Sequence, residues 1–246
     1  MDWRASRANE YYRTHYAHFM DCSPRGYDRM TRRYRFIFGE ILPKDKNARI
    51  LDIGCGPGHF LYFLKKQGYP NIQGIDRSED QLRLCRERVG VPVRQQDAVD
   101  FLLERPGQFD LISALNVLEH LPLENGIELV GLILRALRSG GRVVLAVPNA
   151  ANPYSGGILY GDLTHCLAFT SMSLRQLFAM HGVTDVQFYR DGAAPSDFLA
   201  TMRWLLAVMQ ESVFKLGFLV SIGVGRGSHR HKLILSPEIV ALATKP

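Results

Sequence analysis

The sequence has few cysteines, and none of them is paired. They are Cys22, Cys55, Cys85 and Cys166, and no two of them form a C-x-x-C motif. A disulfide framework or a zinc site is therefore not expected, and the pattern fits a reducing cytoplasm. The first residues are polar and aromatic, so we expect no signal peptide.

Long apolar runs and long basic runs are also missing. The apolar region 198–224 is interrupted by Arg203, Glu211 and Lys215, so it falls short of the ~18 uncharged apolar residues that a membrane-spanning helix needs. Lys and Arg number 30 against 24 for Asp and Glu, which gives a net charge of +6. This mild excess does not indicate nucleic acid, and it fits an anionic membrane surface or an anionic substrate equally well.

The strongest signal lies in residues 50–60, ILDIGCGPGHF. Apolar residues predict a short buried strand, which is followed by a turn through Gly54, Gly56 and Gly58. An apolar run at helical spacing comes next. Strand, glycine turn and helix form half of a βαβ unit, and glycines are needed where the backbone takes positive φ or approaches a ligand closely.

This stretch differs from the dinucleotide-binding fingerprint. The third glycine comes one residue too early for G-x-G-x-x-G, and Asp52 precedes the first glycine by two residues. A carboxylate there repels a pyrophosphate and suits a ligand with a positive centre or an ammonium group. The stretch resembles motif I of the class I S-adenosylmethionine-dependent methyltransferases, whose cofactor carries both a sulfonium and an α-amino group.

Later segments support the same resemblance. A predicted strand at residues 71–76 ends on Asp76, at the spacing where a carboxylate can accept hydrogen bonds from ribose hydroxyls. The next predicted strand, residues 91–97, ends on Asp97. The resemblance implies that Asp97 bonds the adenine amino group, but it could equally cap the helix that begins at Ala98, and both roles can hold together.

Two further strands are predicted at residues 108–115 and 142–148, on either side of a helix over residues 123–137. Phe-Asp-Leu-Ile followed by Leu-Glu-His-Leu looks like motif IV and post-motif IV of the same family. Five strands alternating with helices predict an α/β, doubly wound, Rossmann-like parallel sheet. A sixth strand is predicted at residues 183–190. The resemblance places the last strand, residues 237–244, antiparallel between the fifth and sixth strands, for seven strands in all.

Ligands of doubly wound sheets bind at the carboxyl ends of the strands, where the strand order switches. The glycine turn, Asp76, Asp97 and Asn116 all fall on that edge. The cofactor implied by the resemblance is S-adenosylmethionine. The residues expected to hold it are Asp52, Gly54, Cys55, Gly56, Gly58, Asp76, Arg77, Asp97, Ala98, Asn116 and Val117.

The loop after the fifth strand points to the acceptor. Its pattern Asp-x-Thr-His-x-x-x-Phe-Thr, at residues 162–170, looks like that of methyltransferases that modify bacterial glycans, lipids and quinones. A hydroxyl acceptor loses a proton during transfer, so a histidine base is useful. We expect His165 to be the base or to orient the acceptor, with His120 second and Glu119 beside it. Each histidine could instead be purely structural.

Some relatives with a Glu-x-x-Glu-His segment and a later histidine bind a divalent ion beside the acceptor. Here the segment reads Asn116-Val-Leu-Glu119-His120, and His165 follows later. Asn116 in place of the first acid weakens a site that needs anionic oxygen ligands. No metal ligand is therefore predicted, although a metal-assisted enzyme acting on a quinone or phenol remains the alternative.

Two segments flank this core. Residues 1–46 are interpreted as two helices, of which the first forms a lid, and residues 47–246 as the methyltransferase domain. Residues from about 191 to 236 are expected to form an apolar helical insertion before the last strand. The insertion could be a cap over the acceptor pocket, a peripheral membrane contact through residues 202–224 at the inner face of the membrane, or the surface of a homodimer.

The sequence thus predicts a methyltransferase that acts on the oxygen of a glycan, a glycolipid or another small molecule. A nicotinamide-dependent oxidoreductase is the rival enzyme class, and the glycine spacing and Asp52 argue against it. A cofactor-binding subunit that has lost its chemistry is the rival outside the enzymes.

Overall fold

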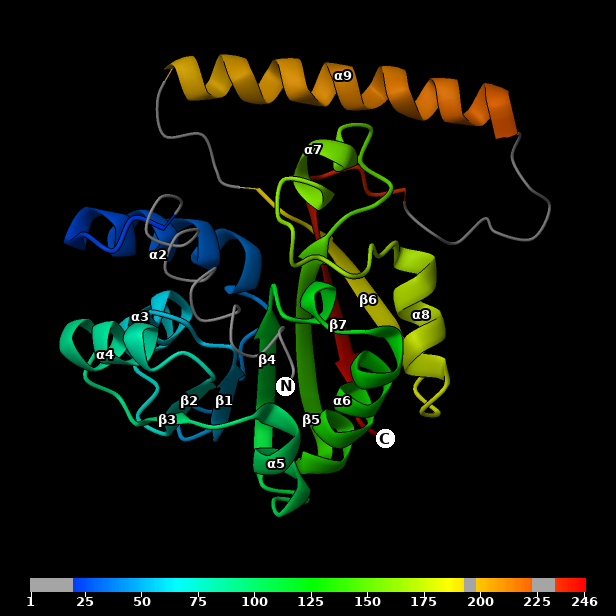
Figure 1. Ribbon diagram of the computed structural model, residues 1–246. Helices are drawn as coiled ribbons and strands as arrows, with labels where there is room; N and C mark the ends of the chain where they lie inside the picture. Colours follow the sequence, from blue (N-terminus) through cyan, green and yellow to red (C-terminus); the bar gives the residue numbers. More distant parts are fainter. Residues whose placement is uncertain (1–19, 193–197, 223–232) are drawn as a thin grey trace.

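The computed structural model describes residues 20–192, 198–222 and 233–246. Its centre is a seven-stranded sheet in which only the last strand in the chain runs antiparallel to its neighbours (Figure 1). The predicted doubly wound fold is confirmed. Across the sheet the strands are β3 (Val93–Gln95), β2 (Ile72–Asp76), β1 (Ile50–Ile53), β4 (Phe109–Leu115), β5 (Leu137–Pro148), β7 (Glu238–Thr244) and β6 (Val186–Arg190).

Helices cover both faces of the sheet, because its central strands are apolar on both sides. One buried cluster joins the sheet to α2 (Pro24–Phe38), α3 (His59–Lys66) and α4 (Glu79–Arg88). The other joins it to α5 (Ala98–Leu103), α6 (Leu123–Ala136) and α8 (Ser171–Ala179). The remaining helices of the described ranges are the short turn η1 (Leu118–His120), α7 (Ser155–Leu159) and the long α9 (Phe198–Ile222).

Helix α2 is the second of the two helices expected in residues 1–46, and the first falls outside the described residues. Ser23 caps its start by accepting a hydrogen bond from the Gly26 amide at 3.2 Å. Its aromatic side chains pack against α3, with the Phe38 and Phe60 rings 5.2 Å apart, edge to face. The Tyr27 hydroxyl donates to the Pro57 carbonyl at 2.6 Å, so α2 also contacts the glycine turn.

Helix and strand ends differ from prediction in three places. Strand β5 begins at Leu137 rather than Arg142, because α6 passes directly into the strand. Residues 139–141 lie in an irregular stretch of β5. Strand β3 is shorter than expected and only partly buried. Strand β6 begins at Val186 rather than at residue 183. Helix α4 begins directly after Ser78, whose side chain makes no capping bond.

The apolar insertion forms α9, which runs above α7 at the end of the sheet where the parallel strands terminate (Figure 1). Among the described residues, no helix has the length and apolar content to cross a membrane.

The third glycine of the turn gives a stability prediction. Gly58 has a φ of +87°, and a Cβ added there would lie 2.3 Å from Cys85 Sγ. Gly68 has a similar φ of +83° but open space around it. We expect Gly68→Ala to cost roughly 1–2 kcal/mol of unfolding free energy from backbone strain alone, and Gly58→Ala a further 1–3 kcal/mol from overpacking. Denaturant unfolding measures both, and equal losses would contradict the packing argument.

Candidate active site

The candidate site lies where the strand order switches. From β1 the chain proceeds outward to β2 and β3, and then returns to β4 on the other side of β1. In doubly wound sheets the ligand-binding crevice lies at such a switch point, outside the carboxyl ends of the strands. We call this place, beside the ends of β1 and β4, the crevice. A Cβ placed on Gly54 would lie 2.6 Å from Val117 Cγ2, so the glycine turn after β1 and the chain just beyond β4 lie side by side.

The conformation of the glycine turn is fixed by its backbone torsion angles and by hydrogen bonds to Asp76. Gly54 and Gly56 have φ of +65° and +52°, a conformation that strains any other residue. The Asp76 carboxylate accepts hydrogen bonds from the Gly56 amide at 2.9 Å and from the Ser78 amide at 2.8 Å. Asp76 therefore ties the turn to the start of α4, in addition to its predicted role toward a ribose.

Cys55 and Gly58, both predicted to bind the cofactor, stabilise the glycine turn by contacts with β2 and α4. The Cys55 amide donates to the Ile75 carbonyl at 3.0 Å, and its own carbonyl accepts from the Gly58 amide at 2.9 Å. The Cys55 thiol packs toward Gly74, where a Cβ would lie 2.6 Å from it. Gly58 packs closely against Cys85 of α4. The structure thus gives Cys55 and Gly58 a role in shaping the turn.

Asp52 is a buried acid at the base of the crevice. It is only 3% exposed, and its carboxylate accepts a hydrogen bond from the Ser113 hydroxyl at 2.7 Å. Burial raises the pKa of Asp52 to about 7, against the lowering effect of Ser113. A positively charged ligand group nearby would stabilise the carboxylate form, so the site fits a cofactor that carries an ammonium and a sulfonium.

Asp97 caps the start of a helix, which was one of its two predicted roles. Its carboxylate accepts from the Val99 amide at 2.8 Å, which caps α5 at Ala98. Its other oxygen pairs with the exposed guanidinium of Arg77. Partial burial acts to raise the pKa of Asp97, but the hydrogen bonds and charge of Arg77 help hold that pKa below its ordinary value. Arg77, which follows β2, and Asp97, which follows β3, are therefore paired at the carboxyl edge. The predicted adenine contact of Asp97 stays a prediction.

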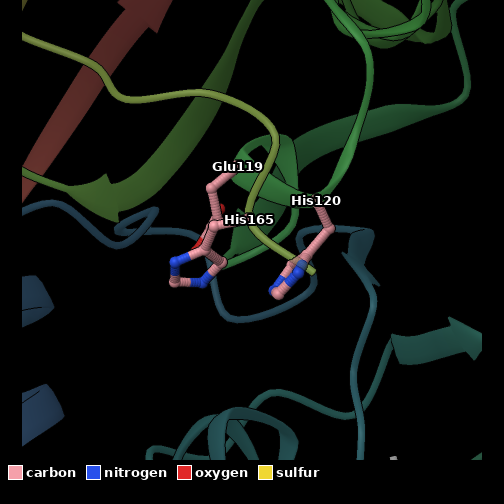
Figure 2. Close-up of side chains that lie close together, drawn as sticks. All are labelled: Glu119, His120 and His165. Carbon is pink, nitrogen blue, oxygen red and sulfur yellow. The ribbon is translucent and has the colours of Figure 1, made fainter. Parts of the chain in front are cut away.

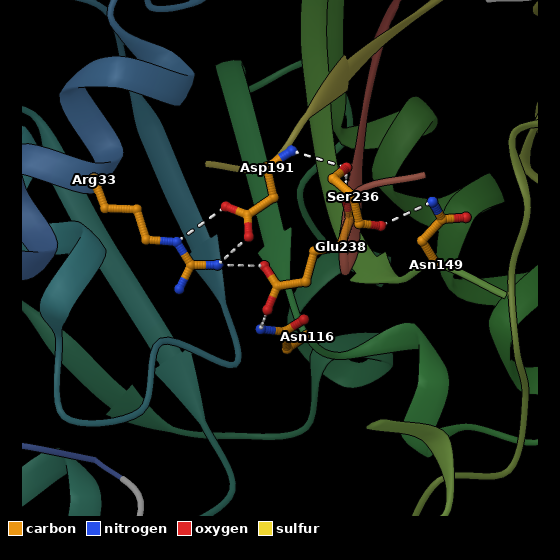
Figure 3. A network of polar contacts seen from close by, with 6 residues as sticks. All are labelled: Arg33, Asn116, Asn149, Asp191, Ser236 and Glu238. Carbon is orange, nitrogen blue, oxygen red and sulfur yellow. Dashed lines mark hydrogen bonds and ion pairs between the residues drawn. The ribbon is translucent and has the colours of Figure 1, made fainter. Parts of the chain in front are cut away.

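Asn116 belongs to a polar network that the sequence did not reveal. It has a φ of +57°, and its amide donates to the Glu238 carboxylate at 3.4 Å. Arg33 of α2 pairs with the same carboxylate at 2.9 Å and with Asp191 at 2.7 Å (Figure 3). Burial raises the pKa of Glu238, and Arg33 counteracts this. The network connects α2 to the residue that follows β6 and to the first residue of β7.

A second cluster lies just beyond Val117. Figure 2 shows Glu119 with the imidazole rings of His120 and His165, which come from η1 and from the loop after β5. Their ligand atoms all lie within 4.8 Å of one another. The two segments are held together by hydrogen bonds from the Cys166 and Leu167 amides to the Glu119 carbonyl, at 2.6 and 3.2 Å. The three residues predicted for the acceptor side therefore converge.

Glu119 is the most unusual member of this cluster. It is 1% exposed, and its Oε2 has no hydrogen-bond partner among the residues that the structure describes. Burial raises its pKa well above the ordinary value, and the negative charges of Glu238 and Asp162 add to this effect. A buried carboxylate oxygen without a partner is costly, so the arrangement calls for a proton or a cation at this point.

Hydrogen bonds orient both histidines. His120 Nδ1 lies 2.8 Å from the Thr164 hydroxyl, which in turn donates to Asp162 at 2.7 Å. His165 Nδ1 lies 3.2 Å from the Leu159 carbonyl, which accepts from the Nδ1–H tautomer. In that tautomer the Nε2 of His165 carries a lone pair. Asp162 and Thr164 were quoted in the loop motif, but their support of His120 emerges only from the fold.

Sequence comparison identifies relatives for part of the chain. A ubiquinone biosynthesis O-methyltransferase from Pseudomonas aeruginosa is 35% identical over 106 residues. That match spans 41% of this chain and 44% of the relative, so less than half of each protein is compared. An enzyme of the same name from Xylella fastidiosa is 32% identical over 107 residues, which span 42% of this chain and 42% of that enzyme.

Solved structures share the fold over most of the chain. A SAM-dependent methyltransferase from Archaeoglobus fulgidus covers 89% of this chain and 94% of its own, with 24% identity and a TM-score of 0.65. A phosphoethanolamine N-methyltransferase from Haemonchus contortus covers 92% of this chain and 54% of its own, with 19% identity and a TM-score of 0.61. The methyltransferase domain family matches residues 16–187. This chain therefore belongs to the methyltransferase domain family, as the glycine turn and the acids at the carboxyl edge predicted.

Proposed function

We propose that the protein transfers a methyl group from S-adenosylmethionine to a hydroxyl of a small-molecule, glycan or lipid-linked acceptor. The observation that carries this proposal is the convergence of Glu119, His120 and His165 just beyond Val117, which borders the glycine turn. Cofactor-binding loops and a proton-accepting cluster then share one crevice. The quinone-modifying relatives are named as O-methyltransferases, which supports an oxygen acceptor. This support comes from the matched part of the chain alone.

The residues at the base of the crevice fit the cofactor. Gly54 is exposed, and a side chain there would collide with Val117, whereas one at the buried Gly56 would collide with Gln81. Asp52 suits the ammonium group, and Asp76 suits the ribose. The cofactor supplies an electrophilic methyl carbon on its sulfonium. The protein contributes alignment of the acceptor with that carbon, which provides much of the rate in bimolecular transfers.

His165 is the proposed base. Its Nδ1–H donates to the Leu159 carbonyl, so Nε2 is free to take the proton of the acceptor's hydroxyl. The hydroxyl oxygen forms a bond to the methyl carbon while the S–C bond of the sulfonium breaks and S-adenosylhomocysteine leaves. Asp162 lies 3.9 Å from that Nε2 and stabilises the imidazolium that results. His120, held by Thr164, lies with its ring 4.8 Å from the His165 ring and orients the acceptor.

To test the proposal, methyl-labelled S-adenosylmethionine is added with the protein to a cell extract separated into lipid-linked glycan, small molecules, protein and RNA. Label in the glycan or small-molecule fraction supports it. Label in protein or RNA would overturn the acceptor class. No label in any fraction despite binding of S-adenosylhomocysteine would favour a non-catalytic subunit. Asp76→Ala serves as the control that lacks cofactor binding.

A metal-assisted O-methyltransferase is the second candidate, and the geometry of the acceptor cluster favours it. Two imidazoles and one carboxylate within 4.8 Å form a donor set typical of Zn²⁺ and other transition metals. The unpartnered Oε2 of Glu119 would gain a ligand bond. Asn116 is directed to Glu238 and does not join the set, so the ion would have fewer anionic ligands than the sequence motif of the relatives supplies.

The two candidates predict different responses to chelation. If the cluster binds a required metal, EDTA abolishes turnover, Zn²⁺ or Mn²⁺ restores it, and Glu119→Gln weakens metal binding by about 10-fold or more. If His165 acts alone as the base, EDTA leaves the rate unchanged and Glu119→Gln has only a small effect. Metal content after gel filtration, measured by mass spectrometry, checks the result independently of turnover.

A further inference from the structure

Helix α9 carries an exposed apolar seam along its whole length. Large apolar side chains recur at alternating intervals of three and four residues, and each is between 41% and 77% exposed. We call this set the α9 seam. It consists of Leu199, Met202, Leu206, Met209, Val213, Leu216 and Val220.

The opposite face of α9 is already in contact with the body of the protein. Glu211 pairs with Arg190 at the end of β6, at 3.2 Å. The Phe214 ring meets the Tyr154 ring edge to face at 5.9 Å, and the Tyr154 hydroxyl also accepts a hydrogen bond from Gln210. Around the helix from Met209, Glu211 lies about 200° away and Phe214 about 140° away, so these two contacts are on the far side from the centre of the seam. Gln210 flanks the seam and borders the body.

The spacing of the seam is that of a coiled coil. A repeat of seven residues with two apolar positions, sustained over about three heptads, is the pattern by which one helix packs against another. The seam itself carries no charge, and the positions that flank it contain Arg203 as their only charged residue. Two copies of the seam would therefore meet without opposing like charges along most of their length.

The exposed area also matches a dimer. A side chain of this size offers on the order of 100 Å² of apolar surface, so the seam amounts to roughly 700 Å², close to the ~800 Å² that each partner contributes to a standard interface. A helix that lies in a membrane surface usually has a strongly charged opposite face. The opposite face of α9 instead packs on α7 and β6.

We propose that the α9 seam is the interface between two copies of this chain, paired helix to helix. The contact is isologous, with the same surface used on both copies, and it closes after two subunits. This proposal does not depend on the acceptor or on the chemistry of the crevice.

The test measures the mass of the full chain by sedimentation equilibrium over a concentration series. We expect wild type to reach twice the 27.8 kDa of one chain. Met209→Glu places like charges near the centre of the interface and should weaken association by about 100-fold or more. The control is Met180→Glu, because Met180 of the α8 terminus is 58% exposed, against 64% for Met209, and lies outside the seam.

Met180→Glu should remain dimeric, and all three proteins should have the same affinity for S-adenosylhomocysteine. A monomeric wild type, or a Met209→Glu variant that still dimerises, would overturn the proposal. Flotation of a monomeric wild type with vesicles of anionic phospholipid, lost in Met209→Glu, would assign the seam to a membrane surface instead.

Discussion

Asp52→Asn should make the protein more stable and weaken its binding of the cofactor. The buried carboxyl has its pKa raised from 3.8 to about 7, so the folded state holds the proton more tightly than the unfolded chain does. The native protein therefore loses stability as the pH rises from ~4 through about 7. Asparagine keeps an oxygen for the Ser113 hydroxyl and removes the buried charge.

The size of the gain depends on pH. A pKa shift of about three units corresponds to roughly 4 kcal/mol, which is an upper limit to what the variant gains above about pH 8. Near pH 4 wild type and variant should differ little. Thermal melts at about pH 5 and pH 8 measure this difference, and a gain that is independent of pH would contradict the assignment of the buried charge to Asp52.

The loss of binding is measured by calorimetry with S-adenosylhomocysteine, which retains the ammonium group. Removing one partner of a buried charge pair costs about 2 kcal/mol or more, so affinity should fall at least about 30-fold. Wild-type affinity should rise with pH up to about 7, because the ligand needs the carboxylate form. Unchanged affinity in the Asp52→Asn variant would show that Asp52 shapes the turn without contacting the ligand.

Ser113→Ala removes the hydroxyl that donates to Asp52, so it should lower the free energy of unfolding at about pH 8.

The positions of the glycine turn and of the strand ends could be predicted because each depends on residues close together in the sequence. Positive φ at Gly54 and Gly56 follows from the tight turn, and Asp76 and Asn116 mark the ends of strands whose alternation with helices is visible in the sequence. Parallel strands bring such ends to one edge whatever the side chains between them. The family and the fold could therefore be identified from the sequence.

The network around Asn116 could not be predicted in the same way. Its amide contacts Glu238, which is 122 residues away in the chain, and Arg33 reaches Asp191 across 158 residues. These contacts exist because β7 runs antiparallel, which brings its first residue to the edge where β4 and β6 end. The signal that was available is that Asp191 and Glu238 stand at strand ends on that edge.

Helix α9 illustrates a different omission. Its apolar residues recur three and four positions apart in the sequence. The overall apolar content of the segment, on which the predicted insertion was based, does not show this spacing. The contacts of Tyr154 with Phe214 and of Arg190 with Glu211 then decide which side of the helix faces the body. The intervals are those of a helix with one apolar face, and long-range contacts were needed to show which face is left exposed.

His165→Asn should reduce methyl transfer by about 10²–10⁴-fold with little change in cofactor affinity. The asparagine amide can replace Nδ1–H as donor to the Leu159 carbonyl, so the loop keeps its contact. It offers no basic nitrogen at the position of Nε2. His165→Gln presents its amide closer to that position and should fail equally, because an amide is not a base.

The response to metal separates a base from a metal ligand. Assays run with EDTA and with added Zn²⁺ should give the same loss if His165 acts as a base. A loss seen only with Zn²⁺ would assign the residue to a metal site. A wild-type rate in the His165→Asn variant would move the base to His120, whose ring lies 4.8 Å away.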